Sequence, residues 1–375
     1  MYLNLLKVWR FYRIYGLSRT VYKLMGRYRA LGRLIIVFKD WKRGGRKYSV
    51  GVIGCGQFAF ATIGYFLKKS GGYRFAQAYD SDAGALVSFC EFYKVGRPAK
   101  RLEDLDFSQL DIVYIASNHA SHAEYAIRAL SQGVSVYVEK PLSVNWDQFR
   151  ALGKVFSENK ADVFVGYNRP FSQPIARLKQ FNAGAVTPLS LSCFVVGHFI
   201  DSDHWYRDPN EGTRVCGNLG HWLDLSVHLL CTKQLPEFLD IRVAVADPEN
   251  PDDNLAVSLV SSSGDLINLV LTSRAEPFEG INETISFNQD DLIATITDFR
   301  EARFWKGHRY LHERYRPKDV GHKKAILQHL HQRNYRRNLD EVRISTALML
   351  EVKDMVLSGT RELRFFPAAD KYIWT

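Results

Sequence analysis

The chain has 375 residues, 46% of them hydrophobic, which is typical of a globular protein with a substantial core and excludes a fibrous or disordered chain. This length predicts two domains. The five cysteines are scattered without a CxxC pair or metal-ligand spacing, so we expect no disulfide framework and no metal site. A reducing, cytoplasmic compartment fits this usage.

The net charge of +10 is concentrated at one end of the chain. Residues 1–47 hold thirteen Lys or Arg and a single acid, Asp40, whereas the remaining 328 residues carry a net charge of −2. The basicity therefore belongs to an N-terminal arm, residues 1–46. Apolar residues recur there at three- and four-residue steps between the cations, which predicts two or three short amphipathic helices broken near Gly16.

Two interpretations of the arm remain open. Interleaved rings and cations suit a helix lying on an anionic membrane, which would place the protein at the inner face of the membrane. An extension that wraps the body or a neighbouring subunit fits equally well. No uncharged apolar run reaches the roughly eighteen residues that a spanning helix needs. Nucleic-acid binding is not expected, because no recognition motif accompanies the charge.

A glycine-rich turn follows the arm. The apolar run of residues 50–53 predicts a buried strand that leads into Gly54-x-Gly56-x-x-Ala59 and then a helix. Gly54 permits the turn, Gly56 lets backbone approach a pyrophosphate, and the small Ala59 lets the helix pack close to the strand. Gln57 and Phe58 lie inside the same turn. Strand, turn and helix N-terminus together predict a phosphate-binding corner.

Strand-like and helix-like segments alternate from residue 50 to residue 165, which predicts a doubly wound parallel sheet. Asp80 ends the second strand, 26 residues beyond Gly54, where a carboxylate can accept hydrogen bonds from an adenosine ribose. Because an acid there repels a 2′-phosphate, NAD is favoured over NADP as the cofactor. The alternative is an ordinary turn aspartate in Asp80-Ser81-Asp82.

Two further strands end in polar loops. Residues 110–116 lead into Ser117-Asn118-His119-Ala120-Ser121-His122, and residues 134–138 lead into Glu139-Lys140-Pro141. Loops at the carboxyl ends of parallel strands line the ligand crevice. A lysine held there near a nicotinamide could accept a proton from a substrate hydroxyl. The alternative for Lys140 is a surface lysine paired with Glu139.

The ordered set Gly54-Cys55-Gly56-Gln57-Phe58-Ala59, Asp80, Ile115-Ala116-Ser117-Asn118 with His122, Glu139-Lys140-Pro141 and Gly166-Tyr167-Asn168-Arg169 resembles the Gfo/Idh/MocA oxidoreductases over roughly residues 48–375. The resemblance implies an α/β protein with a Rossmann domain at residues 47–167. A substrate and oligomerisation domain with a large, mostly antiparallel, open-faced sheet would follow at residues 168–375. It also implies NAD(P)-linked oxidation of a sugar or cyclitol. The implied cofactor-binding residues are Gly54, Gly56, Gln57, Phe58, Ala59, Asp80, Ser117, Asn118, His122, Glu139 and Lys140.

The second half of the chain adds the expected substrate side. Alternating strands there predict a sheet with one face free of helices, and such a face favours a homo-dimer or tetramer. His221 matches the family's catalytic histidine, and Asp224, three residues on, could orient its ring. The implied catalytic residues are Lys140 and His221. The implied substrate ligands, for a sugar bearing phosphate, are Asn168, Arg169, Arg214, Asn218 and Asp224.

One position departs from the family pattern. Many members place an aspartate four residues before the histidine, where this chain has Gly217 followed by Asn218. The expected function is an NAD-dependent sugar dehydrogenase, acting on a nucleotide- or lipid-linked sugar of surface-glycan assembly. A cofactor-binding sensor or scaffold without turnover, an inositol-type cyclitol dehydrogenase, and elimination or glycoside cleavage on the same fold remain alternatives. Deletion of the arm is expected to abolish binding to anionic vesicles and to preserve NAD binding.

Overall fold

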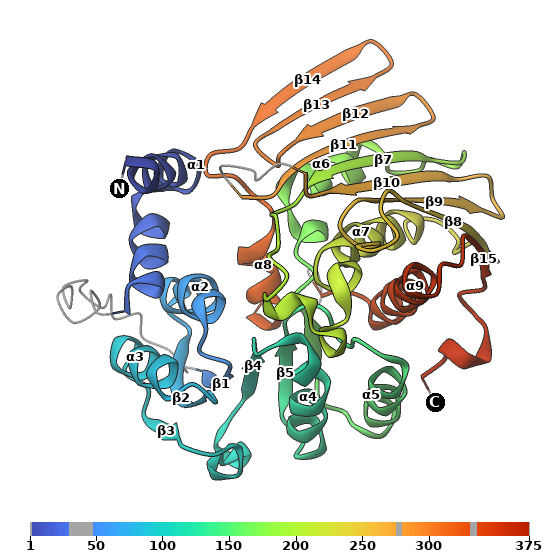
Figure 1. Ribbon diagram of the computed structural model, residues 1–375. Coiled ribbons are helices and arrows are strands. Elements are labelled where there is room, and N and C mark those ends of the chain that lie inside the picture. The colour runs from blue at the N-terminus through green and yellow to red at the C-terminus, as the bar shows by residue number, and fades with distance from the viewer. Residues whose placement is uncertain (1, 30–47, 275–279, 331–335, 375) are drawn as a thin grey trace.

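The structure is a computed structural model that describes residues 2–29, 48–274, 280–330 and 336–374. It is an α/β protein with a parallel sheet in its first half and a larger, mostly antiparallel sheet in its second half (Figure 1). This confirms the predicted fold class.

The first sheet has six parallel strands in the order β3-β2-β1-β4-β5-β6. Its strands are β1 (Tyr48–Ile53), β2 (Tyr73–Tyr79), β3 (Arg97–Ala99), β4 (Ile112–Ile115), β5 (Ser135–Val138) and β6 (Val163–Val165). Its helices are α2 (Gly64–Ser70), α3 (Ala83–Tyr93), α4 (His122–Ser131) and α5 (Trp146–Glu158). Strands β2 and β3 are added on one side of β1 and strands β4 to β6 on the other, so the strand order switches between β1 and β4. Open α/β sheets bind ligands at such a switch point.

The second sheet has nine strands in the order β14-β13-β12-β11-β7-β10-β9-β8-β15. Only the β7–β10 pair is parallel among the pairs of this described sheet. The strands are β7 (Ser190–Val196), β8 (Leu239–Val245), β9 (Leu255–Ser261), β10 (Leu266–Thr272), β11 (Asn282–Gln289), β12 (Leu292–Thr297), β13 (Glu301–Lys306), β14 (Arg309–Arg314) and β15 (Glu362–Phe365). The helices of this half are α6 (Gln173–Phe181), α7 (Gly220–Leu230), α8 (His322–Ile326) and α9 (Leu339–Ser358).

One face of the nine-stranded sheet builds the largest core. Alternate strand residues such as Cys193, Val195 and Leu269 are buried together with Leu225 of α7 and Leu348 of α9. Helices α6, α7 and α9 lie on this side of the sheet in Figure 1. Because strand side chains alternate between faces, the residues between the buried ones fall on the opposite face. The predicted one-sided sheet is therefore confirmed.

The arm forms helix α1 (Tyr2–Arg27), which is interrupted at Gly16, where the backbone adopts φ 80° and ψ 169°. This confirms the predicted break. Tyr22 and Met25 are buried in the core beside the first sheet, and a Cβ on Gly26 would lie 3.2 Å from Phe60. The second half of α1 thus packs on the protein's own body. Among the described residues, no helix is long and apolar enough to cross a membrane.

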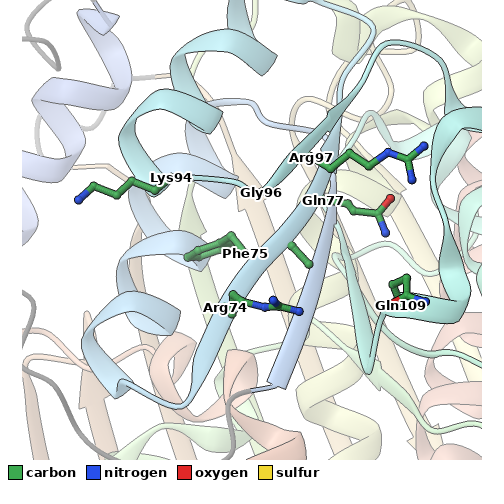
Figure 2. Close-up of a pocket in the computed structure, with 8 residues that line it drawn as sticks. Arg74, Phe75, Gln77, Lys94, Gly96, Arg97 and Gln109 are labelled. Atoms are coloured by element: carbon green, nitrogen blue, oxygen red, sulfur yellow. The ribbon is translucent and has the colours of Figure 1, made fainter.

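A cavity of about 260 Å³ opens beside β2 and β3 (Figure 2). It is lined by Arg74, Phe75, Ala76, Gln77, Lys94, Gly96, Arg97 and Gln109. Arg74 lies near the start of β2 and Gln109 precedes β4, so this cavity lies away from the carboxyl ends of the strands. It is therefore separate from the candidate active site.

Candidate active site

The glycine-rich turn has the shape that a dinucleotide needs. Gly54 has φ 85°, and a Cβ there would lie 2.5 Å from the backbone of Ala116, so only glycine fits. Gly56 is different, because a Cβ on it would meet no described atom within 4 Å. The space in front of Gly56 lets a pyrophosphate approach the backbone. Ala59 is fully buried, as close packing of the helix on the strand requires.

Asp80 is joined to this turn. Its Oδ2 accepts a hydrogen bond of 2.5 Å from the Cys55 amide, and its Oδ1 accepts one of 2.8 Å from the Asp82 amide. A carboxylate oxygen has two lone pairs, so each oxygen keeps acceptor capacity for a ribose hydroxyl. The residues of the turn and Asp80 therefore fit an NAD-type dinucleotide, and the carboxylate fixes where its ribose would lie.

The loop after β4 is bonded to neighbouring loops. His122 is buried, with Nδ1 2.8 Å from the Pro141 carbonyl and Nε2 3.1 Å from the Ser117 carbonyl. Burial lowers the pKa of His122 to about 4. The Asn118 amide donates to Glu211 Oε1 at 2.6 Å. His122 thus joins the loop after β4 to the loop after β5, and Asn118 joins it to the segment that carries Glu211. The sequence predicted these two residues to bind the cofactor and did not reveal this role in holding the loops together.

Lys140 reaches across from the first half of the chain to the second. Its Nζ donates to the Gly217 carbonyl at 2.8 Å, so the ammonium group lies beside the segment that carries His221. Glu139 is buried and accepts hydrogen bonds from the Tyr137 hydroxyl at 2.6 Å and from the Lys140 amide at 3.3 Å. Burial raises the pKa of Glu139 to about 7. The alternative of a surface lysine paired with Glu139 is therefore wrong.

His221 is buried at the start of α7, and its Nδ1 has no hydrogen-bond partner among the described residues. The Tyr167 ring lies edge-on to it at 5.9 Å between centroids. Burial, together with the cationic Arg169 and Lys140, lowers the pKa of His221 well below its ordinary value. The imidazole is thus neutral at pH 7, with a ring nitrogen left to interact with a ligand.

Asp224 does not orient His221, which corrects the expectation from their spacing. Its two oxygens accept hydrogen bonds from the Arg337 guanidinium at 2.9 and 3.0 Å, and the Ser345 hydroxyl donates to Oδ1 at 3.0 Å. Residues three apart on a helix differ by about 60° in direction, and here Asp224 turns toward α9. The Arg337 side chain is only 6% exposed, so the ion pair lies inside the protein.

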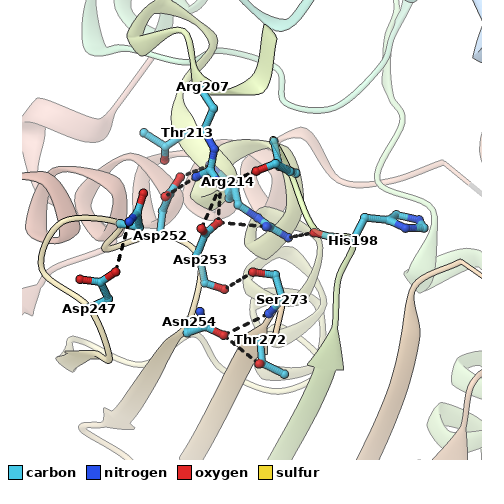
Figure 3. A network of polar contacts seen from close by, with 12 residues as sticks. His198, Arg207, Thr213, Arg214, Asp247, Asp252, Asp253, Asn254, Thr272 and Ser273 are labelled. Carbon is cyan, nitrogen blue, oxygen red and sulfur yellow. Dashed lines mark hydrogen bonds and ion pairs between the residues drawn. The ribbon is translucent and has the colours of Figure 1, made fainter. Parts of the chain in front are cut away.

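Arg169 and Arg214 are also held in internal ion pairs. Arg169 bonds to both oxygens of Glu283, at 2.8 and 3.1 Å, and stacks on the Trp222 ring at 4.1 Å. Arg214 is fully buried and bonds to Asp253 at 3.0 Å and to the His198 carbonyl at 2.9 Å (Figure 3). Each guanidinium is held by an acid of the protein, although Arg214 Nε has no partner among the described residues. The structure thus places both side chains in internal ion pairs, which the expectation of substrate ligands did not include.

Asn168 and Asn218 differ in their surroundings. Asn168 is buried, and its side-chain amide donates a hydrogen bond to the Val320 carbonyl. This bond fixes the segment that leads into α8. Asn218 is half-buried, and its Oδ1 has no partner among the described residues. Asn168 Oδ1 and Arg214 Nε also lack a partner among the described residues, but Asn218 is the least buried of these three side chains.

Two residues that the sequence did not single out complete the site. Glu211 is buried, with Oε1 on Asn118 and Oε2 accepting from the Ala120 amide at 3.1 Å. Tyr206 fills the space beside Gly217, because a Cβ on Gly217 would lie 2.2 Å from the Tyr206 ring. An isolated acid and an aromatic residue in a loop carry no periodicity, so only the folded chain reveals their places.

The buried histidines predict that the protein loses stability in acid. Burial lowers the pKa of His119 to about 2, of His122 to about 4 and of His322 to about 3, against about 6.5 in an unfolded chain. Above pH 6.5 these histidines are neutral in both states, and the folded state keeps its full stability. As the pH falls below 6.5 toward their pKa values in the folded protein, only the unfolded chain takes up protons, and stability is lost. Glu139 acts in the opposite sense, since its raised pKa stabilises the protonated folded form between about 4.5 and 7.

We therefore expect the free energy of unfolding, measured with urea, to fall between pH 6.5 and 5, because three histidines outweigh one glutamate. Each net proton contributes a slope of up to about 1.4 kcal/mol per pH unit. His122→Asn removes one of the groups that take up a proton on unfolding. The number of protons taken up, and with it the slope of the free energy of unfolding with pH, should therefore fall by the share of about one proton. The same slope in wild type and His122→Asn would contradict the account.

Comparison with known proteins agrees with this architecture. The family model described as an oxidoreductase family with an NAD-binding Rossmann fold matches residues 48–167. An inositol 2-dehydrogenase of Ralstonia nicotianae is 30% identical over 175 residues, 44% of this chain and 47% of the relative. Oxidoreductase P35 of Formosa agariphila is 28% identical over 120 residues, 32% of this chain and 37% of the relative. The aligned stretches thus span less than half the length of these two curated relatives.

Solved structures share the fold over most of the chain. GenD2 from gentamicin A biosynthesis, in complex with NAD, superposes with a TM-score of 0.69 at 16% identity, covering 88% of this chain and 99% of that one. Levoglucosan dehydrogenase with NADH and levoglucosan gives a TM-score of 0.70 at 14% identity, covering 85% and 99%. Residues 48–167 thus match the Rossmann-domain model of the Gfo/Idh/MocA oxidoreductases, and the chain shares its two-sheet fold with GenD2 and levoglucosan dehydrogenase.

Proposed function

We propose that this protein is an NAD-dependent oxidoreductase that transfers a hydride between the nicotinamide and a carbinol carbon of a sugar or cyclitol. The observation that carries the proposal is the 2.8 Å contact of Lys140 Nζ with the Gly217 carbonyl, which joins the strand-end lysine to the His221 segment. NAD is preferred over NADP because the Asp80 carboxylate lies at the turn and would repel a 2′-phosphate.

The residues divide the chemistry in a simple way. The bound nicotinamide would accept or supply the hydride. Lys140 and His221 are the candidates to take the proton of the substrate hydroxyl during oxidation and to return it during reduction. Neutral His221 has a ring nitrogen available for this, and Asn218 Oδ1 can accept a hydrogen bond from a second hydroxyl. Oxidation would leave a carbonyl on the substrate and the hydroxyl proton on Lys140 or His221.

The substrate class follows from what the site offers. With Arg169 and Arg214 held by acids, the polar atoms left to a ligand suit the hydroxyls of a neutral ring. The relatives named for inositol and levoglucosan support the same class. A nucleotide- or lipid-linked sugar of surface-glycan assembly belongs in the same test panel, since its uncharged ring would present the same hydroxyls.

A rival function is a cofactor-binding sensor or scaffold without turnover. It is motivated by Gly217, which supplies no acid beside Lys140. A panel of cyclitols, anhydrosugars and nucleotide sugars, assayed with NAD by absorbance of the reduced nicotinamide, distinguishes the two. Reduction of NAD by one member supports the dehydrogenase. NAD binding without any absorbance change across the panel supports the rival.

We propose that the first half of the arm docks on an anionic membrane surface. Leu5, Trp9 and Tyr12 follow one face of the helix at i, i+4 and i+7, and their side chains are 61%, 51% and 47% exposed. The Arg13 guanidinium lies 5.0 Å from the Trp9 ring centre. Exposed rings beside cations suit the headgroup region of an anionic leaflet, which would place the protein at the inner face of the membrane.

The double variant Leu5→Ser/Trp9→Ser is expected to lower sedimentation with anionic vesicles by about tenfold or more, because it removes the apolar contact with the acyl boundary. Val186→Ser, which changes an exposed apolar residue elsewhere, is the control and should bind as wild type does. Binding should also weaken as salt rises. Equal sedimentation of the double variant and wild type would defeat the membrane proposal.

We propose that the open face of the nine-stranded sheet joins a second copy of the chain, in a dimer or tetramer. Ile293 and Trp305 stand opposite each other in the β12–β13 ladder, and both are exposed. Tyr310 pairs with Trp305 on the next strand, and Leu266 pairs with Val260 farther along the same row of the sheet, beyond the polar pair Asn288 and Ser190. All four apolar side chains are exposed, and exposed apolar residues gathered on one face favour an interface.

Ile293→Asp/Trp305→Asp is expected to halve the mass in light scattering, or reduce it further, because two charges would be buried without partners. Leu357→Asp places a charge at an exposed leucine on α9 and should leave the mass unchanged. A monomeric wild-type protein, or an unchanged mass in the double variant, would contradict the interface.

A further inference from the structure

The arm reaches the cofactor turn through Arg29. Its Nη2 donates to the Cys55 carbonyl at 3.0 Å, and its Nη1 donates to the Ala85 carbonyl at 2.9 Å and to the Ser88 hydroxyl at 2.5 Å. Cys55 is the residue between the two glycines of the turn, and the other two partners lie on α3. One guanidinium thus joins the arm, the turn and α3.

Cys55 is consequently held from both sides. Its amide donates to Asp80 Oδ2 at 2.5 Å, and its carbonyl accepts from Arg29. In a trans peptide the carbonyl and the following N–H point in opposite directions. Fixing the Cys55 carbonyl on Arg29 therefore fixes the direction of the Gly56 N–H. Backbone N–H groups of a glycine turn are the donors that meet a pyrophosphate.

Helix α1 ends at Arg27, two residues before Arg29, and its second half is packed against the body of the protein. Tyr22 and Met25 are buried in the same core as Val52 and Ala59, which flank the turn. The Arg19 guanidinium lies 4.8 Å from the Phe66 ring centre and 5.3 Å from that of Tyr65, on the helix that follows the turn. The arm's second half is therefore packed along the segment that would carry the pyrophosphate.

We propose that Arg29 is a positioning residue for dinucleotide binding, which holds the Cys55–Gly56 peptide ready for the cofactor pyrophosphate. The arm is then part of the cofactor site. Removal of residues 1–46 should weaken NAD binding, contrary to what the sequence alone suggested. This inference rests on the NAD binding of the proposed function, but it does not depend on turnover or on the sugar.

Calorimetric titration of the full chain with NAD tests the proposal. Arg29→Ala is expected to weaken NAD binding by roughly tenfold or more, the size of one lost charge-assisted hydrogen bond. Arg29→Lys should recover little, because a point charge cannot bridge three acceptors as a planar fork does. Arg27→Ala, which removes an exposed cation at the end of α1, two residues before Arg29, is the matched control and should bind NAD as wild type does.

A second ligand separates positioning from general damage to the fold. Adenosine monophosphate lacks the pyrophosphate, so its affinity, measured by competition with NADH, should fall much less than that of NAD in Arg29→Ala. Equal losses for both ligands, or an NAD affinity of Arg29→Ala within about twofold of wild type, would overturn the proposal, since twofold is far below one such hydrogen bond. Failure of the wild-type protein to bind NAD would instead refute the proposed function.

Discussion

Lys140→Ala is expected to lower the rate of NAD reduction by about 10²- to 10⁴-fold, the range for loss of a positioned proton acceptor. The effect should appear mainly in kcat. Lys140 Nζ lies 2.8 Å from the Gly217 carbonyl, so removing it leaves the substrate hydroxyl with His221 alone. Lys140→Arg should stay slow, because a guanidinium does not give up its proton in a protein.

The matched control is Lys154→Ala, which removes an exposed lysine from α5. It should keep wild-type kcat and KM. The folded state of each variant is checked by its thermal midpoint, because Lys140 also links the two halves of the chain. A Lys140→Ala protein that folds normally and reduces NAD at the wild-type rate would remove Lys140 from the mechanism.

Gly217→Ala is expected to have the second large effect. A Cβ at this position would lie 2.2 Å from Tyr206 Cε1 and 2.9 Å from His119 Cε1, distances that real atoms do not adopt. The Tyr206 loop and the His119 ring must move, and overpacking of this kind costs about 1–3 kcal/mol. Both a lower thermal midpoint and a loss of turnover should follow, since the displaced groups lie beside Lys140.

A double-mutant cycle isolates the clash. Tyr206→Ala opens the space, so Gly217→Ala should cost little stability in that background. Any side chain at position 217 would need the volume that Tyr206 occupies. A Gly217→Ala cost that is the same with and without Tyr206 would show that the ring is not what requires glycine.

Much of the cofactor half could be predicted from the sequence. The turn at Gly54 and Gly56, the strand before it and the acid at Asp80 are close in the chain and follow local rules of turn geometry and periodicity. The strand-end position of Lys140 followed from the alternation of strands and helices. Tyr206 and Glu211 could not be predicted, because their roles depend on loops that meet only in the folded chain.

The substrate half was harder for a physical reason. Arg169, Arg214 and Asp224 are charged residues near the proposed catalytic residue His221, and sequence alone cannot distinguish a ligand from a buried ion pair. Their partners Glu283, Asp253 and Arg337 lie 114, 39 and 113 residues away. Arg29 could not be predicted either. The arm has many cations, and only the folded chain shows that this one contacts the Cys55 carbonyl.

Single-turnover mixing of the NAD-loaded protein with the sugar and cyclitol panel tests the central claim most directly. The account predicts that one member produces the absorbance band of the reduced nicotinamide in wild type and that Lys140→Ala slows its appearance by about 10²-fold or more. NAD binding without that band for any member of the panel, in wild type and Lys140→Ala alike, would contradict hydride transfer at this site.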